Sequence, residues 1–297
     1  MTEIVELTPS RPVLRAQYRR GALLVAGAAL VWSSAGLIAR TATTDAWTTL
    51  FWRSLYACLF VLLYIGWRDG RAGYAAFRKL DRTGLGVAVS FALSSFTFIT
   101  ALEKTAVANV IIFQAAAPFI AALLAWAWLG ERVGGLSLAA ILASFLGIVV
   151  MVSDSVGQGR VLGDALSLVM GTSFAVMIVL ARRRRDVSMT VAACLATALL
   201  ALVTAPFSSF AIAPFDMLLL VLFGIGQMGL GLIMFTAGVR LMPAADAGLV
   251  STLEVILMPF WVWLVYGENP GPRALAGGAI VLSAVVAHTL FERRGAA

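Results

Sequence analysis

Charged residues are scarce in this sequence, and their scarcity excludes an ordinary soluble domain before any motif is considered. Asp, Glu, Lys and Arg make up 12% of the 297 residues, whereas soluble domains average about 25%. Apolar residues make up 61%, so long stretches of the chain are unsuited to water. We therefore expect an integral membrane protein with little room for a soluble domain.

Histidine and cysteine are almost absent, which excludes the common metal centres. One histidine and two cysteines, Cys58 and Cys194, are too few for a metal cluster of useful spacing. Both cysteines lie in apolar runs, and they occupy matching places in the two halves of the chain. We expect buried core residues rather than a disulfide, and we expect no metal and no cofactor.

Two long apolar stretches resemble each other and reveal an internal repeat. Residues 109–131 and 246–268 each begin with a short polar residue, run apolar, and end in Gly-Glu. Placed on each other, they align Gly130 with Gly267. Each stretch contains one proline, which neighbouring helices tolerate in a membrane because they satisfy the freed backbone groups. The repeat and its internal breaks favour a transporter.

Apolar runs long enough to cross a bilayer, which takes about 20 residues, recur along the whole chain. Counting them predicts ten transmembrane helices, at 21–39, 46–66, 84–102, 106–129, 134–152, 161–181, 188–208, 216–238, 243–266 and 273–291. The polar segment 67–83 between the second and third runs is predicted to be a short amphipathic helix along the interface.

Basic residues set the predicted orientation. With the N-terminus in the cytoplasm, 17 Lys and Arg residues fall on the cytoplasmic side and 4 on the outer side. This bias predicts a bacterial-type inner (plasma) membrane protein with both termini cytoplasmic. It also accounts for the net charge of +7 without a nucleic-acid partner.

The spans divide into two units of five. We predict a cytoplasmic segment over 1–20, a first repeat over 21–152, a second repeat over 161–291 and a cytoplasmic tail over 292–297. Because five is odd, two such repeats must have opposite orientations in the membrane. Inverted repeats are the architecture of many secondary transporters.

Several short motifs resemble one transporter family. Trp32-Ser33-Ser34 in the first span, Phe51-Trp52-Arg53 in the second and the Gly-Glu that follows the proline-bearing fourth and ninth spans are similar to the EamA family of the drug/metabolite transporter superfamily. Within it, the chain looks most like the YddG-type exporters of aromatic and other amino acids. The resemblance implies an all-α, basket-like bundle of ten helices around a central cavity, lined by the first, third, fourth, sixth, eighth and ninth spans.

Polar groups at membrane depth are the first candidates for substrate contacts. Glu254 lies midway along the ninth predicted span, where a charge costs about 2.5–3.5 kcal/mol. It either binds a substrate ammonium, carries a proton, or is a structural residue bonded to neighbouring helices. Pro118 frees the carbonyl of Gln114, and Pro259 frees one beside Glu254, so we predict both prolines as structural hinges and Gln114 as a substrate contact.

Four further residues complete the predictions at membrane depth. Gln227 is a predicted substrate contact, against the alternative of an inter-helix hydrogen bond; its GxGxxG context lacks the strand that a nucleotide site requires. Trp32, Phe98 and Phe174 are predicted to stack on an apolar or aromatic substrate, with core packing as the alternative. Arg53 is expected to extend to the outer interface by snorkelling.

These observations favour a secondary transporter or facilitator that exports small organic solutes by alternating access. Amino acids are the first candidate substrates, and another metabolite or a drug cation is the alternative. A Ser173/His288 intramembrane hydrolase and a membrane scaffold without transport are the other hypotheses. The expected partners are a small-molecule substrate and the lipid bilayer. Proton coupling, substrate identity and oligomeric state stay open at this point.

Overall fold

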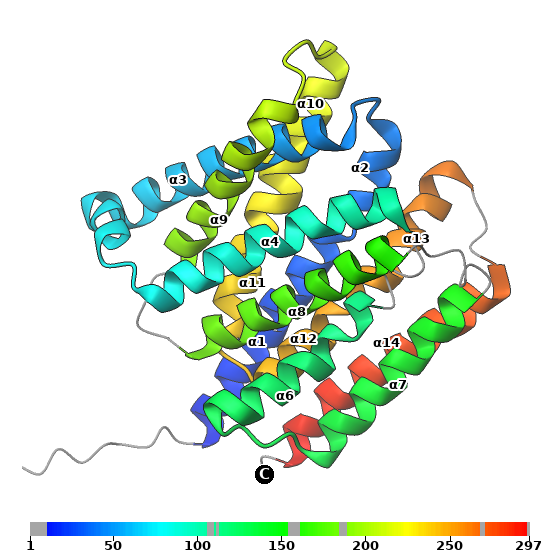
Figure 1. Cartoon of the computed structure of the whole chain (residues 1–297). Coiled ribbons are helices and arrows are strands. Elements are labelled where there is room, and N and C mark those ends of the chain that lie inside the picture. Colours follow the sequence, from blue (N-terminus) through cyan, green and yellow to red (C-terminus); the bar gives the residue numbers. More distant parts are fainter. Residues whose placement is uncertain are drawn as a thin grey trace, which may run out of the picture.

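The computed structural model of the chain describes residues 11–105, 110, 113–153, 161–183, 189–267 and 271–295, and across these ranges it consists of helices and their connections (Figure 1). No β-strand occurs among them. The first described helix begins and the last one ends at the same end of the bundle (Figure 1). This arrangement fits an even number of crossings.

The helices follow the predicted apolar runs closely. In chain order they are α1 (Arg11–Trp32), α2 (Ala35–Thr41), α3 (Ala46–Arg78), α4 (Arg82–Lys104), α6 (Ala117–Leu129), α7 (Gly135–Val152), α8 (Val161–Arg183), α9 (Met189–Thr204), the 3₁₀ turn η2 (Ala205–Phe207), α10 (Pro214–Leu222), the π-helix η3 (Phe223–Leu230), α11 (Gly231–Val239), α12 (Ala244–Ser251), α13 (Leu253–Tyr266) and α14 (Gly271–Gly295).

The chain is a multi-pass membrane protein. Seven described helical stretches are long and apolar enough to cross a membrane, namely Ala46–Arg78, Arg82–Ala101, Val161–Arg183, Met189–Phe207, Pro214–Val239, Ala244–Tyr266 and Gly271–Phe291. Two shorter apolar helices, Phe113–Leu129 and Gly135–Met151, lie among them. The total of ten spans stays a prediction.

Large apolar side chains cover the outer surface of the bundle. Leu23, Leu63 and Leu202 are 68%, 71% and 72% exposed, and many other large apolar side chains are exposed with them. Such a surface suits hydrocarbon, in which helices satisfy their own backbone hydrogen bonds. The core is built from smaller side chains, with alanine and valine prominent, so neighbouring helices approach closely.

The first predicted span differs from the structure in its limits and its continuity. Its helix begins at Arg11, ten residues before the predicted start at Gly21, and stops at Trp32. The hydroxyls of Ser33 and Ser34 then bond to carbonyls three residues earlier, at 2.6 and 2.7 Å. Such bonds compete with the α-helical pattern, and the chain resumes as the separate helix α2.

Part of the segment predicted to be a short helix along the interface is the last portion of α3, which folds back; its place relative to the membrane stays a prediction. Gly70 has φ 55° and ψ −138°, values outside the helical region, so the chain reverses there. Beyond it, the Tyr74 hydroxyl donates to the Leu62 carbonyl at 3.4 Å. A Cβ on Gly66 would lie 2.4 Å from that hydroxyl, so the absence of a side chain at Gly66 allows the reversal to pack.

The two Gly-Glu motifs end their helices in the same way. Gly130 after α6 has φ 67° and ψ 12°, and Gly267 after α13 has φ 69° and ψ 9°. This left-handed C-cap is favourable for glycine because it has no Cβ. The repeat detected in the sequence thus has the same backbone conformation at both places. The repeat also aligns Asn109 with Asp246 and Glu131 with Glu268, but Asn109 and Glu268 lie outside the described residues.

The two cysteines and a pair of glycines form close contacts between helices inside the bundle. The sulfur atoms of Cys58 on α3 and Cys194 on α9 lie 3.9 Å apart, both buried and both free thiols. On α7, Gly147 packs against Gly277 of α14, where added Cβ atoms would meet backbone carbonyl oxygens at 2.8 and 2.3 Å. These glycines bring α7 and α14 side by side (Figure 1).

Candidate functional site

A cavity inside the bundle brings together all six predicted substrate contacts. Its lining includes Trp32 of α1, Phe98 of α4, Gln114 just before α6, Phe174 of α8, Gln227 of η3 and Glu254 of α13. These residues come from both halves of the chain and from each of the six spans that the family resemblance implied. Their roles in binding stay predictions, but the structure places them around one space.

Aromatic rings form the apolar side of the cavity. Trp32 packs against Phe235 with ring centroids 5.0 Å apart and against Phe174 at 6.3 Å, and Phe174 lies 5.5 Å from Phe235. Phe235 is fully buried behind the other two rings. Trp32 and Phe174 therefore pack in the core and also line the cavity, while their stacking on a substrate stays a prediction.

Gln227 occupies a π-helical turn that faces the cavity. Its side-chain Nε2 donates to the Trp32 carbonyl at 3.2 Å, so the predicted inter-helix hydrogen bond exists. Gln227 lines the cavity, and its buried Oε1 has no hydrogen-bond partner within the described part of the chain. π-Helical turns are rare and occur frequently at functional sites.

The glycines of this turn bring α3 close to it. A Cβ on Gly224 would lie 2.6 Å from the Arg53 carbonyl oxygen, and one on Gly229 would lie 2.7 Å from the Phe60 ring. The GxGxxG pattern is thus a helix-packing motif here. It fixes which face of α3 is turned toward the cavity.

Arg53 is a charged cavity residue that the sequence prediction missed. The prediction that it snorkels to the outer interface is wrong, because the residue is only 8% exposed and lines the cavity. Its guanidinium carbon lies 5.0 Å from the centre of the Phe223 ring. A signal was available, since charged residues within spans almost always face an interior or a cavity. Arg53 and Glu254 also interact electrostatically.

The breaks in the fourth and ninth predicted spans do not both coincide with prolines. Pro118 lies in the first turn of α6, directly after an interruption at Ala116, so it starts a helix segment. Pro259, in contrast, lies inside α13, and the interruption in that span is at Thr252. The Thr252 hydroxyl bonds to the Leu249 carbonyl at 2.6 Å, which competes with the α-helical pattern.

The cavity is small in this conformation. Its volume is about 100 Å³, whereas pockets for drug-sized ligands span about 300–1,000 Å³. A compact polar group fits without rearrangement, but an aromatic amino acid requires the lining side chains or helices to move apart.

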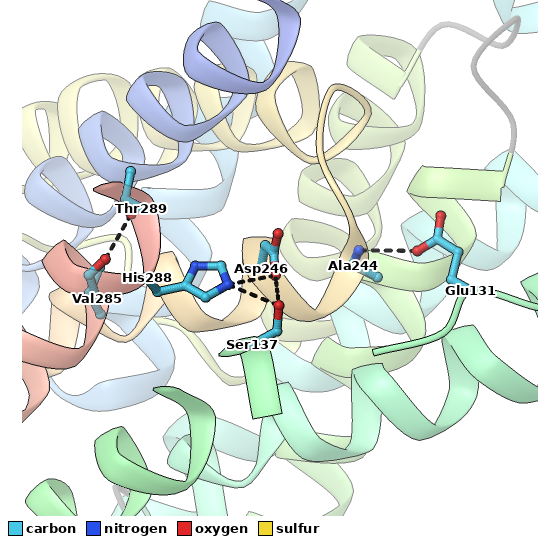
Figure 2. A network of polar contacts seen from close by, with 7 residues as sticks. All are labelled: Glu131, Ser137, Ala244, Asp246, Val285, His288 and Thr289. Carbon is cyan, nitrogen blue, oxygen red and sulfur yellow. Dashed lines mark hydrogen bonds and ion pairs between the residues drawn. The ribbon is translucent and has the colours of Figure 1, made fainter. Parts of the chain in front are cut away.

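A second polar cluster lies outside the cavity and joins three helices (Figure 2). Ser137 of α7 donates to Asp246 of α12 at 3.0 Å and lies 2.9 Å from Nε2 of His288 on α14. The same Nε2 lies 3.4 Å from the Asp246 carboxylate. All three side chains are at most 5% exposed.

This cluster does not support the hydrolase hypothesis. His288 contacts Ser137 and Asp246, not the predicted nucleophile Ser173. A catalytic triad also requires the serine and the acid on opposite ring nitrogens, whereas here both face Nε2. The geometry is that of a structural tie between α7, α12 and α14.

The first Gly-Glu motif contributes another polar contact near the start of α12. The Glu131 carboxylate pairs with Nε of Arg182 at 3.0 Å. It also accepts from the backbone N–H of Ala244 at 3.5 Å (Figure 2). Arg182 in turn donates to the Arg240 carbonyl at 2.9 Å. Beyond any effect on topology, Arg182 therefore ties α8 to the ends of α6 and α11.

Comparisons with known proteins agree with this arrangement. The family model described as the EamA-like transporter family matches residues 19–153 and again 161–290. A crystal structure with 21% sequence identity superimposes with a TM-score of 0.79 and covers 92% of this chain and 98% of its own. At that identity the likeness shows the fold alone. No curated protein matches the chain significantly.

Proposed function

The chain belongs to the EamA-like transporter family, and we propose that it is a secondary transporter that exports small organic solutes, amino acids including aromatic ones among them. We further propose that ten spans form two inverted repeats that alternate access to a site between them. Both termini are then cytoplasmic, in a bacterial-type inner membrane. The observation that supports this best is a cavity that residues from both repeats line together.

The composition of the lining supports an amphiphilic substrate. Glu254 offers a carboxylate for an ammonium group, and Gln114 and Gln227 offer amide groups that donate and accept. Trp32 and Phe174 present ring surfaces on which an apolar or aromatic side chain can pack. The alternative substrate is another metabolite or a drug cation, for which Glu254 would also be the counter-ion.

The broken helices support a transport cycle. The interruptions at Ala116 and Thr252 lie close in sequence to Gln114 and Glu254, both of which line the cavity. Discontinuous helices at the repeat interface are where secondary transporters hold polar substrate groups and bend between conformations. The cavity of about 100 Å³ requires such a movement before an aromatic amino acid can enter.

Flux measurements on the purified protein in proteoliposomes test this proposal. We expect a panel of amino acids, amines and neutral metabolites to reveal protein-dependent flux, measured with and without an imposed proton gradient. Glu254→Gln should lower that flux or change its pH response, whereas the matched control Asp69→Asn, at the exposed end of α3, should not. Folded protein without flux of any solute refutes the proposal, and unchanged flux and pH response in Glu254→Gln remove this acid from it.

Topology has its own test. Reporter tags before α1 and in the connection after α7 should lie on opposite sides of the membrane, because an odd number of crossings in the first repeat is what inverts the second one. The same side for both tags contradicts the inverted arrangement, while leaving membership of the family intact.

A further inference from the structure

A cation is buried in the wall of the cavity. Arg53 lies on α3 with only 8% of its surface exposed, between the cavity and the Phe223 ring. Because the backbone of α3 packs closely against Gly224, α3 has little freedom to rotate and turn the Arg53 side chain away from the cavity. Burying a charge at membrane depth is expensive, and residues that do so mark substrate or ion pathways.

Two buried polar atoms of cavity-lining residues have no hydrogen-bond partner among the residues that the structure describes. They are Nε of Arg53, a donor, and Oε1 of Gln227, an acceptor, and both residues are more than nine-tenths buried. Most buried polar atoms in proteins are paired, and an unpaired one carries a desolvation cost. A ligand that accepts from one and donates to the other removes both costs.

The charges around the cavity have opposite signs and are separate. Arg53 and Glu254 both line it and interact electrostatically, but they form no direct ion pair in the part of the chain that the structure describes. A cavity with an acid alone would select cations. One with a cation as well repels a simple amine and favours a ligand that carries both charges.

We propose that Arg53 and Glu254 are the two ends of a zwitterion site that recognises α-amino acids. Arg53 binds the carboxylate, for which the planar guanidinium fork is suited. Glu254 and Oε1 of Gln227 bind the ammonium group, and the substrate side chain lies toward Trp32 and Phe174. The inference rests on the proposed function, because it assigns a substrate class to the same cavity.

Three probes that differ by one charged group test the site without any mutation. L-Phenylalanine carries both charges, phenethylamine lacks the carboxylate and 3-phenylpropionate lacks the ammonium. We expect the wild-type protein in lipid nanodiscs to bind L-phenylalanine at least about 10-fold more tightly than either analogue, measured by calorimetry. L-Leucine with isoamylamine and 4-methylpentanoate provides a second series with a smaller side chain.

Variants then assign each charge to its residue. Arg53→Gln should weaken L-phenylalanine binding about 10- to 100-fold while phenethylamine binding stays the same or strengthens, because its repulsion is removed. Arg53→Lys keeps the charge and loses the fork, so we expect an intermediate loss. Glu254→Gln should weaken L-phenylalanine and phenethylamine but not 3-phenylpropionate. Arg68→Gln, an exposed arginine on the same helix, is the matched control.

Different outcomes overturn the inference and the proposed function separately. Equal wild-type affinity for L-phenylalanine and phenethylamine overturns the zwitterion site, as does an equal loss of both in Arg53→Gln. If neither L-phenylalanine nor L-leucine binds but other solutes show flux in proteoliposomes, the zwitterion site is wrong and transport stands. If no solute shows flux, the proposed transport function is refuted, whatever the binding measurements show.

Discussion

The hydroxyl of Ser137 provides a sharp test of how the bundle is held together. It donates its single hydrogen to Asp246 at 3.0 Å and accepts from Nε2 of His288 at 2.9 Å, and so links α7 to both α12 and α14 (Figure 2). The substitution Ser137→Ala removes one oxygen atom and leaves the rest of the packing in place. Its effect therefore reports the polar tie rather than a cavity in the core.

The expected magnitude follows from burial and charge. A hydrogen bond to a charged group contributes about 1.5–3 kcal/mol, and the partners of Ser137 are buried, where water cannot replace it easily. At roughly 2–4 °C per kcal/mol for a chain of this size, we expect the thermal midpoint to fall by roughly 3–12 °C. Tryptophan fluorescence of the detergent-solubilised protein measures this midpoint.

A matched control and a double-mutant cycle make the result specific. Ser153→Ala removes an exposed hydroxyl at the end of the same helix, bonded to the Val150 carbonyl, and should change stability by less than about 0.5 kcal/mol. Combined with Ser137→Ala, Asp246→Asn should cost less than the sum of the single changes, with a coupling of about 0.5–3 kcal/mol. Strict additivity, or equal effects of the two serine substitutions on stability, would refute an energetic coupling between the Ser137 and Asp246 side chains.

Two further predictions concern backbone packing and helix capping. Gly224→Ala should reduce both stability and amino-acid flux, because its Cβ would meet the Arg53 carbonyl at 2.6 Å, whereas Gly226→Ala, with no atom within 4 Å, should leave both nearly unchanged. Partial burial raises the pKa of the Asp45 carboxyl, but hydrogen bonds from Thr48 outweigh it and lower this pKa below its ordinary value. The ionised Asp45 carboxylate therefore stabilises the folded state fully above its ordinary pKa of about 4. This stabilisation is lost as the pH falls through the lower pKa of the folded state. Asp45→Asn keeps the N-cap, so its thermal midpoint should fall less than that of the wild type between about pH 5 and pH 3.

The residues around the cavity could be found in the sequence because a membrane penalises polar groups strongly. Gln114, Gln227 and Glu254 stand out within apolar runs, and in hydrocarbon such side chains must face a protein interior. The repeat placed them in spans of both halves. The structure brings all three to the same cavity, although what they bind is still untested.

The position of Arg53 was predicted wrongly because the residues next to it in the sequence do not determine which way its side chain points. A long basic side chain in a span can either extend to the interface or face the interior, and both arrangements satisfy its charge. The choice depends on the rotation of α3 about its axis. That rotation is set by packing against Gly224 and Gly229, which lie in η3 and are far away in the sequence.

Two of the helix breaks, after Trp32 and before Leu253, occur at hydroxyl side chains and not at prolines. At residues 33–34 and 251–252, consecutive hydroxyl side chains bond to carbonyl groups three residues earlier and interrupt a helix. One break follows Trp32 and the other precedes Glu254, both cavity residues. Proline permanently removes a backbone donor, as Pro259 does, but a hydroxyl can exchange its partner as the helix bends. Breaks made in this way can change their angle at little cost, which is the property that a helix bordering a substrate cavity needs if the cavity is to widen and close.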